Sequence, residues 1–243
     1  MPDHRQHRGV HPEDRSLWSP NRLPFLQSAV QDMSWLLGHG YASKSVLKLV
    51  GDRYNLHARQ REAVSRCSCS EQRRQARGSR QLSSEAVRGR PLLLDAFNVI
   101  TTVEVALSGG VLLAGRDGCL RDVAGVHGTY REVEETVPAI LLLGGFLQEL
   151  QPSGCCWLLD QPVSNSGKLR GIVLHLSRQQ GWGHTAELSP DPDKVLIRGS
   201  EVVVSSDSAV LDACGPWFNL VRAVVKAHVP DAWIIPLGSC GAG

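Results

Sequence analysis

Three short apolar runs in this sequence each lead to an aspartate, and this pattern constrains the fold more than any other feature. Asp95 ends the run 91–94, Asp160 ends the run 155–159, and Asp207 follows the segment 201–206. Such runs predict buried strands, and helical patterns separate them. Alternating strands and helices predict an α/β domain with a mostly parallel sheet. The carboxyl ends of parallel strands form one edge, so we expect the three aspartates to converge on one crevice there.

Three carboxylates in one crevice repel each other unless a positive group lies between them. A hard divalent cation with oxygen ligands meets this requirement. Two of the aspartates also have a second interpretation. Asp95 could cap the turn that follows its strand, and Asp207 could cap the next helix. The sequence leaves both interpretations open.

Polar residues beside the three aspartates could bind a phosphate. Asn98 lies three residues after the first aspartate and could orient a water molecule or a phosphate. Asn165 could cap the helix predicted after the second aspartate. The free N–H groups at the start of that helix, with Lys168 nearby, suit a phosphate. Ser206 precedes the third aspartate and adds a hydroxyl to that corner.

Four segments of the chain differ in composition. Residues 1–20 are polar and show no period, so we expect them to be disordered. Apolar residues at spacings of three and four predict a small helical domain over 21–69. Residues 70–90 are rich in Arg and Ser and form a basic linker, either a flexible connector or a basic helix. The α/β pattern occupies residues 91–243.

The net charge of +2 hides an asymmetry between the two parts of the chain. Residues 1–90 contain sixteen Lys and Arg against eight Asp and Glu, whereas the remaining residues contain ten against sixteen. A basic part beside an acidic part suits a grip on a polyanion next to a metal site. We expect the helical unit and the arginines of residues 73–90 to provide that grip. The alternative is a solvated helical surface followed by a partly disordered linker.

The sequence favours a cytoplasmic protein that makes no membrane contact. The longest apolar stretch, 137–147, is interrupted by two glycines and is too short to cross a bilayer. The N-terminal residues carry charge without an apolar core, so they do not form a signal peptide. Seven cysteines in a chain of 243 residues suit reduced thiols better than a disulfide framework.

Several motifs resemble those of a known group. The Asp95-x-x-Asn98 pattern, an acid after a middle strand and the Ser-Ser-Asp-Ser motif at 205–208 resemble the PIN-like nuclease superfamily, including its NYN branch. More closely, residues 94–100, 115–122, 162–167 and 205–208 resemble an uncharacterised prokaryotic family. In that family a short helical domain of unknown function precedes a PIN-like domain. The resemblance covers roughly residues 22–225 and includes the helical segments 40–41 and 47–54.

This resemblance implies a PIN-like three-layer fold and metal-dependent phosphodiester hydrolysis, usually of RNA. It implies Mg²⁺ or Mn²⁺ as the cofactor, which would activate a water and neutralise charge on the scissile phosphate. The metal-facing catalytic acids would be Asp95, Asp160 and Asp207. The contacts to phosphate or substrate would be Asn98, Asn165, Ser206 and Lys168.

A fourth acid is usual in the superfamily, and several residues of this chain compete for the role. We include Asp122 among the metal ligands, although it follows Arg116 and Arg121 and could equally form a structural ion pair. The other candidates are Glu104, Asp117, Glu134 and Glu135.

Two other classes of function remain open. One is a non-catalytic nucleic-acid-binding or protein-interaction module on the same fold. The other is a metal-dependent phosphatase or nucleotide hydrolase that uses the same acids on a small substrate.

Overall fold

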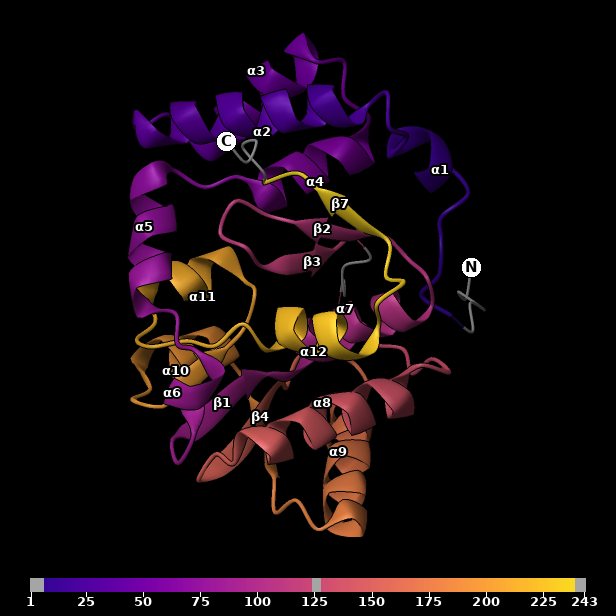
Figure 1. Ribbon diagram of the computed structural model, residues 1–243, viewed down its shortest axis with the longest axis vertical. Coiled ribbons are helices and arrows are strands. Elements are labelled where there is room, and N and C mark those ends of the chain that lie inside the picture. Colours follow the sequence, from indigo (N-terminus) through magenta and orange to yellow (C-terminus); the bar gives the residue numbers. More distant parts are fainter. Residues whose placement is uncertain (1–6, 124–127, 239–243) are drawn as a thin grey trace.

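A four-stranded parallel sheet organises the C-terminal part of the chain (Figure 1). We describe it from a computed structural model, which places residues 7–123 and 128–238. The strand order is β5-β4-β1-β6, and every neighbouring pair is parallel. The strands are β1 (Pro91–Asp95), β4 (Gly154–Asp160), β5 (Thr185–Ser189) and β6 (Val202–Val204).

Helices cover both faces of this sheet, which confirms the mixed α/β class predicted from the sequence. Leu92 and Leu94 of β1 pack into one core, while Leu93 between them packs into the other. This alternation is the two-residue period of a strand buried on both faces. The first core includes α7 (Ala96–Leu107), α8 (Thr136–Leu150), α9 (Ser166–Gln180) and α12 (Leu220–His228). The second includes α10 (Pro192–Arg198) and α11 (Ser208–Ala213).

The direction in which successive strands are added to the sheet reverses between β1 and β6. The chain passes from β1 to β4 and then outward to β5, before it returns across the sheet to pair β6 with the free side of β1. Ligands of open α/β sheets bind beyond the carboxyl ends of the strands at such a reversal. The topology therefore favours a ligand position where Asp95 ends β1 and residues 205–207 follow β6.

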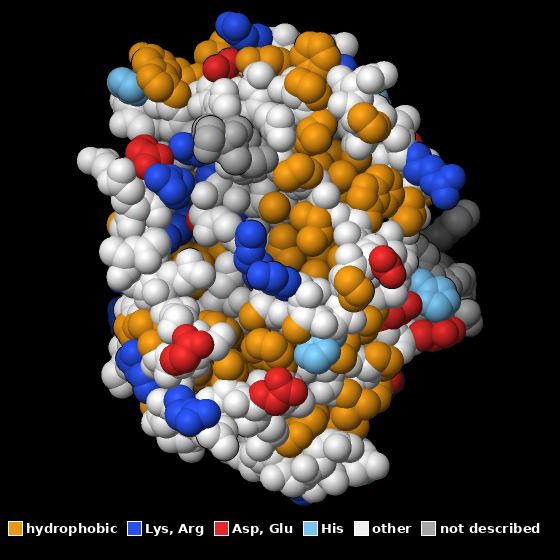
Figure 2. Space-filling model, viewed as in Figure 1, with side chains coloured by type: hydrophobic (Ala, Val, Ile, Leu, Met, Phe, Trp, Pro, Cys, Tyr) orange, Lys and Arg blue, Asp and Glu red, His pale blue; other side chains and the backbone are white. Residues whose placement is uncertain are grey.

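A second, smaller sheet joins the α/β layers to the helical unit. Its order is β3-β2-β7, with β2 antiparallel to β3 and parallel to β7. Leu112 packs into the α/β core, whereas Leu113 packs into the core of the helical unit. Figure 2 shows hydrophobic side chains exposed across the middle of this face, where β7 lies in Figure 1. The strands are β2 (Leu112–Ala114), β3 (Leu120–Asp122) and β7 (Ile234–Pro236).

The N-terminal helices lie above this second sheet (Figure 1). Three of them match the predicted helical domain: α2 (Leu23–Gly38), α3 (Ser43–Arg53) and α4 (Ala58–Cys67). Residues 7–20 differ from the expected disorder, and residues 1–6 lie outside the described residues. Here α1 (Asp14–Leu17) leads to the buried Trp18, whose Nε1 donates to Asp14 Oδ1 at 2.9 Å. Asp14 also pairs with Arg59 of α4 at 3.0 Å, so an internal ion pair holds this segment in place.

The basic linker is helical, which answers a question that the sequence left open. It forms α5 (Glu71–Arg80) and α6 (Ser84–Val87), each begun by a serine cap. In α5 the charged side chain of Arg77 is only 2% exposed. The helix packs against α11 at the side of the molecule (Figure 1). This segment is therefore a structural element that connects the helical unit to the sheet.

Two further details bear on the predictions. The spacing of apolar residues predicts a helix over 129–150, but α8 begins at Thr136 and residues 129–133 before it are not helical. Among the helices of the described ranges, none combines the length and the apolar character that a bilayer crossing requires.

Candidate active site at the carboxyl edge of the sheet

Asp95 stands at the end of β1 and caps the helix that follows. Its Oδ1 accepts a hydrogen bond from the backbone N of Asn98 at 3.4 Å. Its Oδ2 accepts one from Ser205 Oγ at 2.7 Å. Ser205 reaches this carboxylate because β6 is parallel to β1 and Leu94 pairs with Val204. The capping interpretation and the edge position are both correct for this residue.

Asn98 joins the first turn of α7 to the loop after β6. Its Oδ1 accepts from the backbone N of Ser206 at 2.8 Å and from the hydroxyl of Ser206 at 2.9 Å. These two predicted phosphate contacts thus lie together, but they bind each other. Their joint effect is to fix the loop that carries Asp207 against the end of β1.

Asp207 lies at the first exposed position beyond β6 and caps α11. Its Oδ1 accepts from the backbone N of Ala209 at 2.7 Å and of Val210 at 3.1 Å. Its own backbone N donates to Ser205 Oγ at 3.0 Å. Because Ser205 also donates to Asp95, one hydroxyl connects the two predicted acids.

Asp160 lies further along the edge than the other two predicted acids. Asp95 pairs with Leu158 across the β1–β4 ladder, so Asp160 extends two residues beyond Asp95 in the strand direction. Burial raises the pKa of Asp160, and the charge of Asp191 raises it further. Asp191 lies in the segment that follows β5, where no metal-binding acid was predicted.

That segment supplies a fourth acid, Asp193, in the first turn of α10. The helix begins after Asp191, whose side chain accepts from Lys194 N at 3.2 Å. Burial raises the pKa of Asp193, and the charges of Asp207, Asp160 and Asp191 raise it further. Because α10 packs against β1, β4 and α11, Asp193 stands between acids from different strands. The sequence contains a signal for this acid, since two aspartates, at positions 191 and 193, follow residues 185–189.

The electrostatics of the edge follow from this grouping. Burial raises the pKa of Asp95 to about 7, and the charges of Asp193 and Asp207 raise it as well. The hydrogen bond from Ser205 lowers this pKa but does not outweigh the other effects. A shift of this size and cause is common at functional sites, where carboxylates are held together against their repulsion. We call Asp95, Asp160, Asp193 and Asp207 the acidic edge.

The acidic edge does not form a ready-made metal cage. Within residues 7–123 and 128–238, no three His, Cys, Asp or Glu side chains lie grouped closely enough to hold one ion. The donor set consists of carboxylate and hydroxyl oxygens, which suit hard cations. Mg²⁺ usually keeps several waters and binds through only one or two carboxylates. The residues therefore fit a partly hydrated Mg²⁺ or Mn²⁺, and they do not fit an ion that requires a full set of protein ligands.

The residues considered for the fourth acid lie in other networks. Asp122 is in β3 of the second sheet, where it accepts from Thr102 Oγ1 at 3.1 Å and lies 3.9 Å from Arg66. Glu104 is fully buried and binds Arg8 and Tyr130, as well as Thr136 at 2.6 Å. These contacts describe structural ion pairs.

The remaining three candidates are also engaged. Asp117 is buried between Arg77 and Arg121, at 2.5 and 2.6 Å. Glu134 and Glu135 both face His7, at 3.8 and 2.6 Å.

Asn165 and Lys168 lie at the start of α9, as predicted, and beside a small hollow. Asn165 has a left-handed backbone (φ +69°), a conformation that asparagine tolerates, and its Nδ2 donates to the carbonyl of Tyr130 at 2.8 Å. Lys168 is exposed and pairs with Glu132 at 2.6 Å. With Arg131 they line a hollow of about 250 Å³.

Taken together, the fold and the site define a mixed α/β protein with an acidic edge at the strand reversal and a helical unit at its N-terminus. Residues 84–223 match the family described as "Domain of unknown function (DUF5616)", and the chain belongs to this family. Residues 25–80 match the family described as "Protein of unknown function (DUF434)". The two matches meet between α5 and α6.

The chain is also similar to "Uncharacterized protein MJ0935" of Methanocaldococcus jannaschii. The two are 25% identical over 186 residues, which cover 76% of this chain and 88% of that protein. No solved structure matches the chain.

Proposed function

We propose that this protein is a metal-dependent nuclease with a PIN-like fold, which hydrolyses phosphodiester bonds of RNA at the acidic edge. The observation that carries this proposal is the grouping of three acids where the strand order reverses: the charges of Asp193 and Asp207 raise the pKa of Asp95, and the charge of Asp207 raises the pKa of Asp193. The resemblance of the strand-end motifs to PIN-like nucleases supplies the reaction class.

The cost of this grouping supports a functional role. Carboxylates that are buried near like charges destabilise the folded state unless a cation neutralises them. A helix cap or a turn needs only one such residue, and serine or asparagine would serve without the repulsion. Several acids from distant parts of the chain are therefore better explained by a shared positive ligand than by local structure.

The residues at the acidic edge would have different roles in binding the ion. One or two of Asp95, Asp193 and Asp207 would bind the ion directly, and the others would bind it through its waters. When bound, Mg²⁺ or Mn²⁺ would lower the pKa of a coordinated water and polarise the phosphate. Ser205 holds Asp95 by donating to its Oδ2, and Asn98 fixes the loop through Ser206.

The proposed contact for the RNA backbone is the hollow at the start of α9. Lys168 is exposed there beside Arg131, and α9 begins in the same place. The arginines of α5 suit this role less well than the sequence analysis expected. Arg73 and Arg77 both pair with Asp212, at 2.8 and 2.7 Å.

The test is cleavage of a fluorescent single-stranded RNA in Mn²⁺, with calorimetric titration of Mn²⁺ in parallel. We expect Asp193→Asn and Asp207→Asn to lower the cleavage rate at least 100-fold and to weaken Mn²⁺ binding. Asp231→Asn is the matched control, since Asp231 is an exposed acid between α12 and β7. The same activity in Asp193→Asn as in the unmodified protein would refute the assignment.

The other classes of function give different results in the same assays. Tight RNA binding with neither cleavage nor Mn²⁺ binding would favour the non-catalytic module. Turnover of a mononucleotide with no loss of intact RNA would favour a phosphatase or a nucleotide hydrolase.

A further inference from the structure

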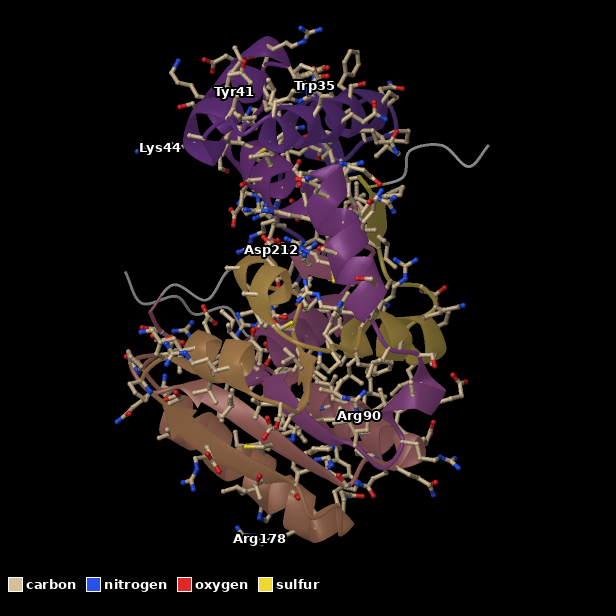
Figure 3. All side chains as sticks on the ribbon, turned by 90° about the vertical axis from the view of Figure 1, so that its left-hand side faces the viewer. Trp35, Tyr41, Lys44, Arg90, Arg178 and Asp212 are labelled. Atoms are coloured by element: carbon tan, nitrogen blue, oxygen red, sulfur yellow. The ribbon has the colours of Figure 1, made fainter. Side chains whose placement is uncertain are left out.

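A buried cluster of charges lies behind the loop that carries Asp207. Arg77 comes from α5 and Arg121 from β3, and both bind the carboxylate of Asp117. Arg121 makes two bonds to this carboxylate, at 2.8 and 2.6 Å, and Arg77 makes one at 2.5 Å. Asp212 of α11 binds the other side of Arg77 at 2.8 Å. Figure 3 shows Asp212 where α5 meets α11.

The two arginines also bind the backbone on both sides of Asp207. Arg121 Nε donates to the carbonyl of Ser206 at 2.8 Å. Arg77 Nη2 donates to the carbonyl of Ser208 at 3.1 Å. The residue between these two carbonyls is Asp207. Two guanidinium groups from distant segments therefore hold the acid's immediate neighbours in the chain.

The turn between β2 and β3 is built to admit this cluster. A Cβ on Gly115 would lie 2.6 Å from Arg121 Nη1 and 3.0 Å from Asp117 Oδ1, so a side chain there would displace the pair. Gly118 adopts a left-handed backbone, with φ +78°. Residues 115–122 include Asp117 and Asp122, two of the candidates for a fourth metal-binding acid, but the proposed metal site uses neither of them.

The charges of the cluster are fixed over the ordinary range of pH. Burial alone would raise the pKa of Asp117, but Arg121 and Arg77 outweigh this effect and hold it at about 2. The arginines are 2% and 5% exposed, so little water competes for their hydrogen bonds. Because a guanidinium group forms several bonds in one fixed plane, it can orient a carboxylate and a carbonyl together.

We propose that Arg77 and Arg121 are positioning residues. They hold the segment 206–208 so that Asp207 faces the other three acids of the acidic edge. This inference rests on the proposed function of that edge. Arg77 belongs to the segment that matches DUF434, whereas Asp207 belongs to the segment that matches DUF5616. The helical unit thus contributes to the site through α5, and the two parts of the chain form one functional unit.

Arg80 provides a matched control for this proposal. It lies three residues after Arg77 in α5 and also binds α11, through the carbonyls of Leu211 at 2.9 Å and of Cys214. These carbonyls are at the far end of α11 from Asp207. A role limited to docking α5 against α11 would make the two arginines equivalent, and a positioning role would not.

The experiment compares Arg77→Lys, Arg121→Lys and Arg80→Lys in the full chain. Hydrogen exchange measured by mass spectrometry reports on residues 206–210, and calorimetric titration reports the affinity for Mn²⁺. We expect Arg77→Lys and Arg121→Lys to speed exchange in this segment at least tenfold and to weaken Mn²⁺ binding at least tenfold. Arg80→Lys should change neither quantity by more than twofold.

The outcomes separate this inference from the proposed function. Equal effects of Arg77→Lys and Arg80→Lys, or no effect of Arg77→Lys on exchange, would overturn the positioning role. If exchange responds as expected but the unmodified protein binds no Mn²⁺, the positioning of Asp207 stands and the metal-dependent function fails. If Mn²⁺ binds and Asp193→Asn weakens it while Arg77→Lys has no effect on affinity, the function stands and the positioning role fails.

Discussion

Replacing Asp95 with asparagine is expected to stabilise the fold at alkaline pH. The asparagine keeps an oxygen that can accept from the backbone N of Asn98, and Ser205 can still form a hydrogen bond with the new amide. The variant loses the negative charge of the carboxylate. Burial and the neighbouring acids raise the pKa of this carboxyl group from 3.8 to about 7. A shift of about three pKa units corresponds to about 4 kcal/mol. Because the side chain is partly exposed, we expect a gain of about 2 kcal/mol.

The sign of the effect depends on pH in a defined way. Below pH 4 the folded and unfolded states both hold the proton on Asp95, so its charge has no effect on stability. Between pH 4 and pH 7 the folded state holds the proton while the unfolded state releases it, so the stability of the unmodified protein falls as pH rises. Above pH 7 both states are ionised and the destabilisation is complete.

The assay is urea unfolding of the unmodified protein and of Asp95→Asn, in EDTA, at pH 8 and pH 4. We expect Asp95→Asn to be more stable by about 2 kcal/mol at pH 8 and the difference to vanish at pH 4. Asp231→Asn is the control and should show no such change with pH. A variant that is less stable at pH 8, or a gain that is the same at both pH values, would refute this account of the acidic edge.

Three other predictions concern the rest of the structure. Glu104→Ala should lower the free energy of unfolding in urea by about 3 kcal/mol, because it leaves Arg8 without its buried partner. The affinity for Mn²⁺ should stay unchanged, and weaker Mn²⁺ binding would show that Glu104 contributes to the metal site. Leu113→Ala should cost about 3 kcal/mol and keep a single unfolding transition, because β2 packs into both cores; two separate transitions would contradict this. Burial raises the pKa values of Cys67 and Cys119 to about 12, so iodoacetamide at pH 8 should leave both thiols unlabelled in the native protein. Peptide mass spectrometry measures the labelling, and rapid labelling of either cysteine would contradict its burial.

Local patterns predicted most of the elements of this fold. The strands ending at Asp95 and Asp160 are uninterrupted apolar runs, and the spacing of apolar residues predicted the helical domain over 21–69 that contains α2, α3 and α4. Residues 7–20 and 70–90 were harder to predict, because their order depends on ion pairs with distant residues. Asp14 is held by Arg59, and Arg77 by Asp117. A composition rich in charge indicates exposure unless the partner of each charge is known.

The candidate site was predicted in part for the same reason. Parallel strand order follows from the alternation of strands and helices, so the edge positions of Asp95 and Asp207 could be expected. Asp193 was missed because three of the five residues of β5 are exposed, so no continuous apolar run precedes this acid. Asp122 was considered as a metal ligand, but it belongs to the second sheet and binds Thr102. Sequence position alone does not distinguish the two sheets.

The most direct test of the central claim is an anomalous diffraction measurement on crystals soaked in Mn²⁺. The account predicts an anomalous peak at the acidic edge, with one or two of Asp95, Asp193 and Asp207 bound to the ion directly and waters completing the coordination. The same soak of Asp193→Asn crystals should lose or weaken this peak. Ordered side chains at the edge with no anomalous density between them, at saturating Mn²⁺, would contradict the claim that these acids share a divalent cation.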